Sequence, residues 1–331
     1  MRACISAVGH YTPEKRLTNQ ELERMVDTND EWITTRTGIK ERRVLDPGLG
    51  TSHMAIHAGR RVLDSRGLSA DALDAILLAT VTPDMPVPSA AALVQTALGA
   101  RNCWGMDLNG GCTGFLCALA TGAQFIESGR HKNVLVIGAD AMSSIINYED
   151  RNTCILFGDG AGAVLLEGIP GDANGIQDFI LHLDGAGAPF LKVPAGGSLK
   201  PASPETVANH EHCVYQDGRT VFKHAVTGMV DVAEKVLARN GLTSADVGLL
   251  VPHQANSRII DSVSRRLHLS PDQVFINIQN YGNTTAATIP IALSEAHHDH
   301  HRLAAGDWVL LTAFGAGFTW GSLLMRWADC A

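Results

Sequence analysis

Charged and aromatic residues are both scarce in this chain of 331 residues. Asp, Glu, Lys and Arg together make up 18% and Phe, Trp and Tyr 5%, whereas charged residues alone reach about 25% in an average soluble domain. Hydrophobic residues are in ordinary supply at 45%. This excludes a disordered chain, which combines low hydrophobicity with much charge. Low charge together with 33 glycines indicates that an unusual share of the surface is hidden, as in an oligomer interface.

The sequence also lacks a basic run, since pairs such as 42–43 and 265–266 are not extended, and the net charge is −8. A nucleic-acid-binding protein usually carries a basic stripe, so we expect no nucleic-acid partner. The seven cysteines form no CxxC motif, which is typical of free thiols in a reducing compartment. The apolar segment 5–8 is too short for a signal peptide. We therefore expect a cytoplasmic protein.

Two long stretches, 108–126 and 308–325, contain no charged residue. Each approaches the roughly 20 residues of a membrane span, but glycine and polar residues interrupt both. We expect no membrane span here. Elements buried on all sides inside a large core have the same composition.

The two halves of the chain have the same order of expected elements. Short apolar strands alternate with helices, and each half ends in a pair of strands around glycines, 154–157 with 163–166 and 308–312 with 321–326. Another expected strand lies at 274–278. Any α/β protein alternates in this way, but the matching positions favour duplication. The sequence therefore predicts two similar α/β halves, 1–172 and 173–331, with a loop at 185–211 that could cover a pocket.

Cys112 is the first candidate for chemistry, in the string Asn109-Gly-Gly-Cys-Thr-Gly-Phe115. A strand, two glycines and an expected helix place its sulfur at a helix N-terminus, where the partial positive charge favours thiolate over thiol. A buried structural cysteine is the alternative reading. His253 follows an expected buried strand, a usual place for α/β sites, and Asn283 opens a helix in the second half. A structural histidine and a helix cap are their alternatives. Together, the three residues make a plausible Cys-His-Asn site.

The chain resembles β-ketoacyl-acyl carrier protein synthase III in several strings. They are the string around Cys112, the segments 157–163, 251–256, 282–284 and 314–321, and Glu31-Trp-Ile33 with Arg36-Thr-Gly-Ile39. The resemblance implies an α/β thiolase-like fold of five α-β-α-β-α layers, built from two similar halves and working as a homodimer. It implies a decarboxylative Claisen condensation of an acyl-CoA primer with malonyl-acyl carrier protein, which initiates fatty acid biosynthesis. Acyl-CoA is then a substrate, and no cofactor or metal is permanently bound.

The resemblance also implies roles for single residues. Cys112 takes the acyl group as a thioester, and His253 and Asn283 donate hydrogen bonds to the enolate that forms when carbon dioxide leaves. The backbone N–H groups of Cys112 and Ala316 form an oxyanion hole. A carboxylate beside the enolate would oppose its charge, and the strings around Cys112, His253 and Asn283 contain none.

Further positions are implied for substrate contacts. Those for coenzyme A are Trp32 and Arg151, as a sandwich around adenine, with Thr28, Arg36, Gly218 and Asn256. Those for the acyl pocket are Val87, Met142 and Phe157, with the loop 189–199. Those for the acyl carrier protein are Lys223, Arg258, Arg265 and Arg266, for which solvated helix faces are the alternative reading. A small Val at 87 predicts room for a branched or longer acyl chain.

Three rival functions remain open at this point. A secondary-metabolism relative of the same fold, a polyketide priming synthase or another acyltransferase, is the closest. A thiolase would need a second cysteine as base, and Cys330 lies too near the terminus. A non-catalytic binding protein is disfavoured because Cys112, His253 and Asn283 are all present. The histidine-rich run 297–301 resembles a metal-binding tract only in its spacing.

Overall fold

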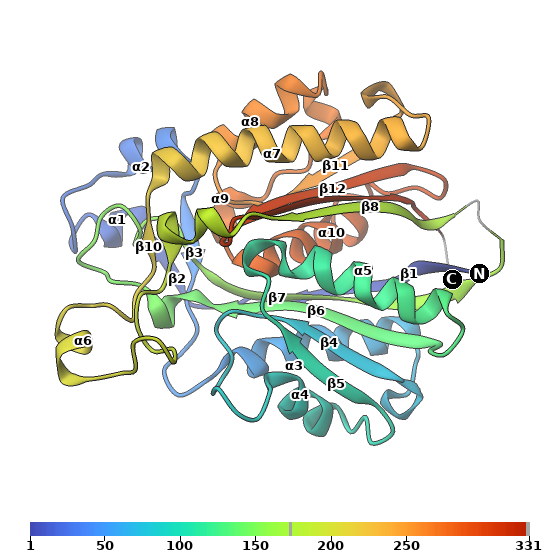
Figure 1. Ribbon diagram of the computed structural model, residues 1–331, viewed down its shortest axis with the longest axis horizontal. Helices are drawn as coiled ribbons and strands as arrows, with labels where there is room; N and C mark the ends of the chain where they lie inside the picture. Colours follow the sequence, from blue (N-terminus) through green and yellow to red (C-terminus); the bar gives the residue numbers. More distant parts are fainter. Residues whose placement is uncertain (172–173, 329–331) are drawn as a thin grey trace.

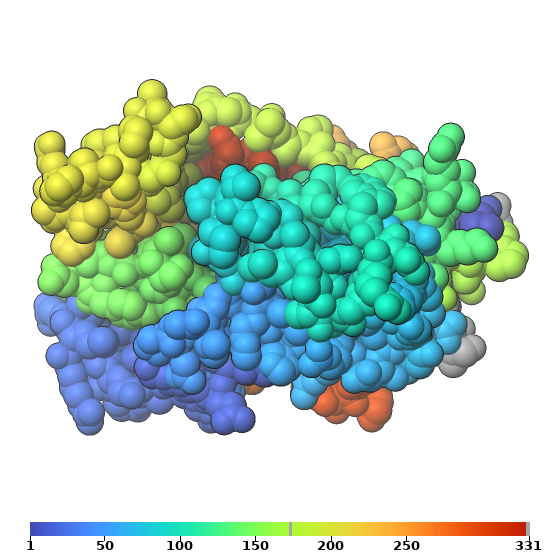
Figure 2. Space-filling model, turned by 90° about the horizontal axis from the view of Figure 1, so that it is seen from below, coloured from blue at the N-terminus to red at the C-terminus, as the bar shows by residue number. Residues whose placement is uncertain are grey.

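Two large sheets alternate with three layers of helices in the computed structural model, which describes residues 1–171 and 174–328 (Figure 1). From top to bottom in Figure 1, the layers are α7 with α8, the second-half sheet, α5 with α10, the first-half sheet, and α3 with α4. This is the expected α-β-α-β-α order. Seen from below, α3 in blue and the teal region of α4 and β5 cover much of the surface (Figure 2).

The first-half sheet has the strand order β1-β7-β6-β4-β5. β6, β4 and β5 run parallel, and β7 is antiparallel to both β1 and β6. Helices α3 and α4 pack on its outer face, and α5 packs on its inner face. The strands are β1 (Arg2–Tyr11), β4 (Ala75–Ala79), β5 (Trp104–Leu108), β6 (Asn133–Ala141) and β7 (Asp159–Ile169), and the helices are α3 (Thr51–Arg66), α4 (Ala90–Leu98) and α5 (Gly114–Glu127).

The second-half sheet has the order β11-β12-β13-β8. Here β11 and β12 are parallel and β13 is antiparallel to both of its neighbours. A single parallel bridge from Val274 to Leu250 extends this sheet where β5 extends the other. The elements are β8 (Gly175–Leu183), β11 (Leu249–Pro252), β12 (Trp308–Gly315), β13 (Thr319–Arg326), α7 (Gly218–Arg239), α8 (Ser257–Arg266) and α10 (Thr288–His298). The two sheets therefore share strand order and sense, while residues 172 and 173, at the predicted boundary, lie outside the described residues.

Short elements gather at one end of the layers, on the left of Figure 1. The predicted loop 185–211 is partly regular, because it contains α6 and a strand that pairs with β10. These elements are β2 (Arg16–Thr18), α1 (Asn19–Leu22), α2 (Asp30–Thr37), β3 (Glu41–Arg43), β9 (Leu191–Lys192), α6 (Pro204–Ala208), β10 (Tyr215–Gln216) and α9 (Ile278–Tyr281).

The two uncharged stretches are inner elements, as expected. The first contains α5, which packs between the sheets, and the second forms the β12–β13 hairpin. In the described part of the chain, no helix is both long enough and apolar enough to cross a membrane.

Two sequence-based expectations are wrong. Residues 154–156 form turns and Phe157 makes only an isolated bridge to Asn283, while 159–169 is one continuous strand, so the first half has no glycine hairpin there. In the expected strand 274–278, Val274 makes a single bridge and Ile278 begins α9. The glycines of β7 serve close packing instead of a turn, since a Cβ at Gly162 would lie 2.6 Å from the backbone nitrogen of Ile291. Its partner across the ladder, Gly138, would place a Cβ 2.2 Å from the carbonyl oxygen of Ala286.

Candidate active site

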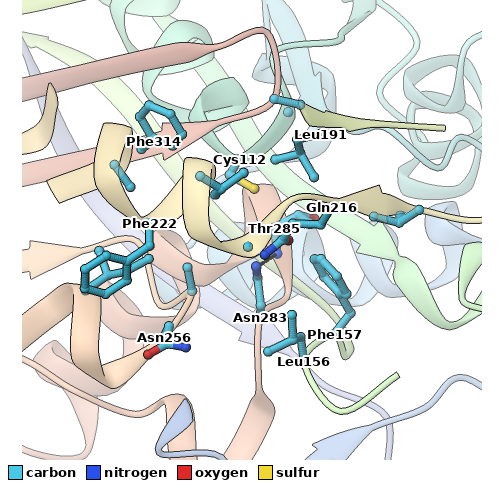
Figure 3. A pocket seen from close by; sticks show the side chains of 18 of the residues that line it. Cys112, Leu156, Phe157, Leu191, Gln216, Phe222, Asn256, Asn283, Thr285 and Phe314 are labelled. Atoms are coloured by element: carbon cyan, nitrogen blue, oxygen red, sulfur yellow. Dashed lines mark hydrogen bonds between the residues drawn. The ribbon is translucent and has the colours of Figure 1, made fainter. Parts of the chain in front are cut away.

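A cavity of about 870 Å³ brings the three predicted residues Cys112, His253 and Asn283 together. Figure 3 shows Cys112, Asn283 and Thr285 around one space, with Phe157 on one side and Phe222 on the other. The cavity also reaches Trp32 on α2, so it extends from the catalytic candidates to the helix predicted to bind coenzyme A.

Cys112 lies in a single 3₁₀ turn, Gly111–Thr113, directly before α5. The turn meets the β12–β13 hairpin closely. A Cβ at Gly315 would lie 2.7 Å from the Cys112 nitrogen, and one at Gly111 would lie 3.3 Å from the Ala316 nitrogen. The backbones of Cys112 and Ala316 are therefore neighbours, as the predicted oxyanion hole requires.

The expected activation of the Cys112 thiol by the helix N-terminus is wrong in direction. Burial, together with the charge of Asp140, raises the pKa of Cys112 to about 12. Loss of solvation for a buried thiolate outweighs the partial charge at the start of a helix. The resting residue is therefore a neutral thiol.

His253 is buried and neutral, because burial lowers its pKa to about 3. Its Nδ1 lies 2.7 Å from Oγ1 of Thr288, and the hydroxyl of Thr288 donates a hydrogen bond to the carbonyl oxygen of Thr285 at 3.0 Å. A neutral imidazole has one N–H. Nε2 can donate into the cavity only when the Thr288 hydroxyl turns from the Thr285 carbonyl to donate to Nδ1, so Thr288 sets which tautomer is present.

Asn283 has a fixed amide orientation. Its Oδ1 accepts a hydrogen bond from the Thr285 backbone N–H at 2.9 Å, which leaves Nδ2 as the group able to donate elsewhere. The Asn283 backbone is tied to the segment before β7, because its N–H donates to Leu156 at 2.9 Å and its carbonyl accepts from Gly158 at 3.1 Å. The turn that carries Asn283 is thus bonded to the wall that carries Phe157.

Thr285 has a φ of 50°, in the left-handed region. A β-branched residue there is a genuine outlier, and such conformations cost about 1–3 kcal/mol each. The surrounding bonds must hold this turn in place.

Asp140, at the end of β6, is a site residue that sequence reasoning missed. It is fully buried and its charge acts on Cys112. The strings around Cys112, His253 and Asn283 contain no carboxylate, but the fold brings Asp140 from β6 near enough for its charge to act on Cys112. An aspartate inside the otherwise apolar run 133–141 was the available signal.

The predicted coenzyme A residues are mostly gathered at one end of the cavity. The Arg151 guanidinium carbon lies 4.7 Å from the Trp32 ring centroid, and that of Arg36 lies at 5.9 Å. Arg151 also forms an ion pair with Asp27 at 3.6 Å. Trp32, Arg36, Gly218 and Asn256 line the cavity, whereas Thr28 and Arg151 do not.

Met142 and Phe157, which were predicted for an acyl pocket, line the cavity together with Leu191 and Val193 of the loop 189–199. Val87 does not line the cavity of its own chain and is 83% exposed. Any role for Val87 in an acyl pocket therefore requires a second chain.

Three of the four basic residues predicted to meet a carrier protein, Lys223, Arg265 and Arg266, line one groove between α7 and α8. The fourth, Arg258, lines the main cavity and lies over the Phe222 ring at 5.7 Å. Phe222 borders both spaces, so the groove adjoins the cavity.

The histidine-rich run 297–301 lies outside this cavity, and the described residues hold no group of three or more His, Cys, Asp or Glu suited to a metal ion.

Comparisons with known proteins agree on one family. The model for 3-oxoacyl-[acyl-carrier-protein (ACP)] synthase III matches residues 106–192, and the model for its C-terminal part matches residues 237–327. The β-ketoacyl-[acyl-carrier-protein] synthase III of Chlorobaculum tepidum is 53% identical over 99% of this chain and 100% of its own length. That of Solibacter usitatus is 54% identical over 99% of each chain. The crystal structure of 3-oxoacyl-[acyl-carrier-protein] synthase III from Aquifex aeolicus has a TM-score of 0.90 at 42% identity, covering 98% of this chain and 100% of that one.

Proposed function

The chain belongs to the 3-oxoacyl-[acyl-carrier-protein] synthase III family, and from this premise we propose how its residues carry out the family's reaction. It is an acyltransferase of fatty acid biosynthesis that condenses an acyl-CoA primer with malonyl-acyl carrier protein and releases carbon dioxide. The expected thiolase-like α/β fold is confirmed.

Cys112 begins the reaction. Its sulfur bonds to the acyl carbonyl carbon, the thioester bond to coenzyme A breaks, and the coenzyme thiol leaves with the proton that Cys112 gives up. The carbonyl oxygen becomes negative during this step, and the backbone N–H groups of Cys112 and Ala316 stabilise it. Each such donor is worth about 3 kcal/mol in acyl-transfer enzymes.

His253 and Asn283 act in the second step. The bond between the malonyl carboxyl carbon and its neighbour breaks, carbon dioxide leaves, and the electron pair forms an enolate. Once the Thr288 hydroxyl donates to Nδ1 of His253, Nε2 of His253 and Nδ2 of Asn283 donate to the enolate oxygen, and both groups are neutral donors that need no change of charge. The enolate carbon then bonds to the acyl carbon, and the Cys112 sulfur leaves and regains a proton.

The observation that carries this proposal is the meeting of Cys112, His253 and Asn283 in one cavity. Intact-protein mass spectrometry after incubation with acetyl-, isobutyryl- and octanoyl-CoA tests it. The wild type and Cys117→Ser should gain the mass of one acyl group, whereas Cys112→Ser should gain none. Acylation of Cys112→Ser at the wild-type rate would overturn the nucleophile assignment. The preferred primer also tests the prediction that Val87, supplied by a second chain, leaves room for a branched or longer acyl chain, since a clear preference for acetyl would contradict it.

Trp32, Arg36 and Arg151, with Thr28 nearby, are proposed to hold the adenine end of coenzyme A, and Gly218 and Asn256 its pantetheine arm. Stacking on Trp and a guanidinium supports this. The groove of Lys223, Arg265 and Arg266, with Arg258, is proposed to receive the acidic carrier protein. A local basic groove on a chain of net charge −8 favours steering of an acidic partner.

A homodimer is proposed from the open edge of the first-half sheet. β5 is its last strand, and Trp104 and Met106 on it are 43% and 36% exposed. An exposed apolar edge strand is a template for pairing with another chain. Sedimentation equilibrium should give a dimer, and a monomer at micromolar concentration would contradict the proposal.

The remaining proposals concern compartment and halves. Five of the described cysteines, Cys103, Cys112, Cys117, Cys154 and Cys213, are free thiols, which supports a reducing compartment, the cytoplasm. The half 1–172 supplies Cys112, and the half 173–331 supplies His253 and Asn283.

A further inference from the structure

The Asp140 carboxylate ties together two segments far apart in the sequence. Oδ1 accepts hydrogen bonds from the loop after β4: Val81 N–H at 2.7 Å, Thr80 hydroxyl at 2.9 Å, Thr82 hydroxyl at 3.0 Å and Thr82 N–H at 3.2 Å. Oδ2 accepts from the turn after Asn283, namely the Thr285 hydroxyl and the Ala286 N–H, the latter at 3.2 Å. Both oxygens of the carboxylate therefore accept hydrogen bonds, one from each segment.

The second set of bonds leads to Asn283. Asp140 holds Thr285 in its left-handed conformation, and in that conformation the Thr285 N–H meets Oδ1 of Asn283 at 2.9 Å. That bond leaves Nδ2 of Asn283 as the amide group able to donate to substrate. A chain of two contacts thus joins the buried carboxylate to the orientation of the amide.

The same carboxylate has an effect that a purely structural group would not need. Its charge raises the pKa of Cys112 and so disfavours the thiolate. Burial raises the pKa of Asp140 itself, and the donors around it oppose that rise by stabilising the carboxylate. An ionised group in this place works against the acylation step while it supports the geometry of the decarboxylation step.

We propose that Asp140 is a positioning residue for condensation, which orients Asn283 through Thr285. The proposal rests on the role of Asn283 given above. It predicts that removing the charge affects the two half-reactions in opposite directions, whereas loss of a merely structural bond would weaken both.

Asp140→Asn is the direct test. It replaces one carboxylate oxygen by an amide nitrogen, which cannot accept the hydrogen bonds that this oxygen accepts. Decarboxylation of malonyl-acyl carrier protein, followed as release of labelled carbon dioxide, should fall about 100-fold, the loss expected for a misplacement near 1 Å. The pH midpoint of Cys112 alkylation by iodoacetamide should move downward. Equal losses in both half-reactions, or unchanged decarboxylation, would overturn the proposal.

Asp159→Asn is the matched control. Asp159 is also a buried carboxylate that holds loops, but it accepts its hydrogen bonds from Leu45 and Ser143, which lie outside the Asn283 turn. This variant should leave the ratio of the two half-reaction rates unchanged. A shift of that ratio equal to the one in Asp140→Asn would refute a specific role for Asp140.

Thr285 variants keep the test open if Asp140→Asn does not fold. Thr285→Val has the shape of Thr but no hydroxyl and should lose decarboxylation without moving the alkylation midpoint. Thr285→Ser should retain more decarboxylation than Thr285→Val, and equal activity of the two would contradict the proposal. Asn283→Ala tests the role of Asn283 separately from that of Asp140. Full decarboxylation activity in that variant would refute the role of Asn283 itself.

Discussion

Replacing Gly138 by alanine should damage the condensation step through the backbone alone. The added Cβ would lie 2.2 Å from the carbonyl oxygen of Ala286 and 2.8 Å from its carbonyl carbon. A normal C···O contact is about 3.3 Å, so the turn that follows Asn283 must retreat by about 1 Å. A displacement of that size near reacting groups costs about 100-fold in rate. Overpacking of this kind also destabilises a core by about 1–3 kcal/mol.

The assay compares the two half-reactions in Gly138→Ala and in a control glycine variant. Decarboxylation of malonyl-acyl carrier protein should fall about 100-fold, while acylation of Cys112 falls much less, because the clash falls on the Asn283 turn. Gly185→Ala is the control, since nothing lies within 4 Å of its added Cβ. Decarboxylation within twofold of wild type in a folded Gly138→Ala protein would refute the reasoning.

Three further predictions concern charge and stacking. The pKa of His253 is lowered from 6.5 to about 3, so the unfolded chain binds its proton more readily, and stability should decline as the pH falls from 6.5 toward 3. The difference between these two pKa values corresponds to about 5 kcal/mol of unfolding free energy. Chemical denaturation at several pH values should show that this free energy depends less on pH in His253→Gln than in the wild type. The same pH dependence in both proteins would contradict this. Trp32→Ala should raise the KM for acyl-CoA about tenfold, the order of one lost base stack, with kcat preserved in steady-state kinetics; a change in kcat alone would oppose the assignment. Arg265→Glu with Arg266→Glu should raise the KM for malonyl-acyl carrier protein but not for acyl-CoA, most strongly at low salt; equal effects on both substrates would count against the docking groove.

The sequence was sufficient to identify candidate residues that lie at the ends of strands and helices. Cys112, His253 and Asn283 each follow a strand or precede a helix, and motif strings mark all three. The alternation of strands and helices likewise predicted both halves. Such features are local, so their signal survives in a single sequence.

Features set by packing between distant segments were not predictable. Asp140 bonds to Thr80 and Thr285, which are 60 and 145 residues away. The glycines of 158–162 indicated a turn, although Gly162 is required by the approach of α10 to β7. The high pKa of Cys112 depends on burial by both halves, while the local string showed only the helix N-terminus.

The contact between Trp32 and Arg151 has a consequence for how tightly a nucleotide can bind. A planar base held between them needs two van der Waals contacts, about 7 Å in all, and the guanidinium carbon lies only 4.7 Å from the ring centroid. At the proposed adenine site, Arg151 therefore already occupies the place of the base, and it also forms an ion pair with Asp27. In this proposal, the free energy gained when adenine stacks on the Trp32 indole is reduced by the free energy of the Arg151 stack that it replaces. Shortening Arg151 removes a contact in the complex and a rival in the free protein, so the two effects partly cancel.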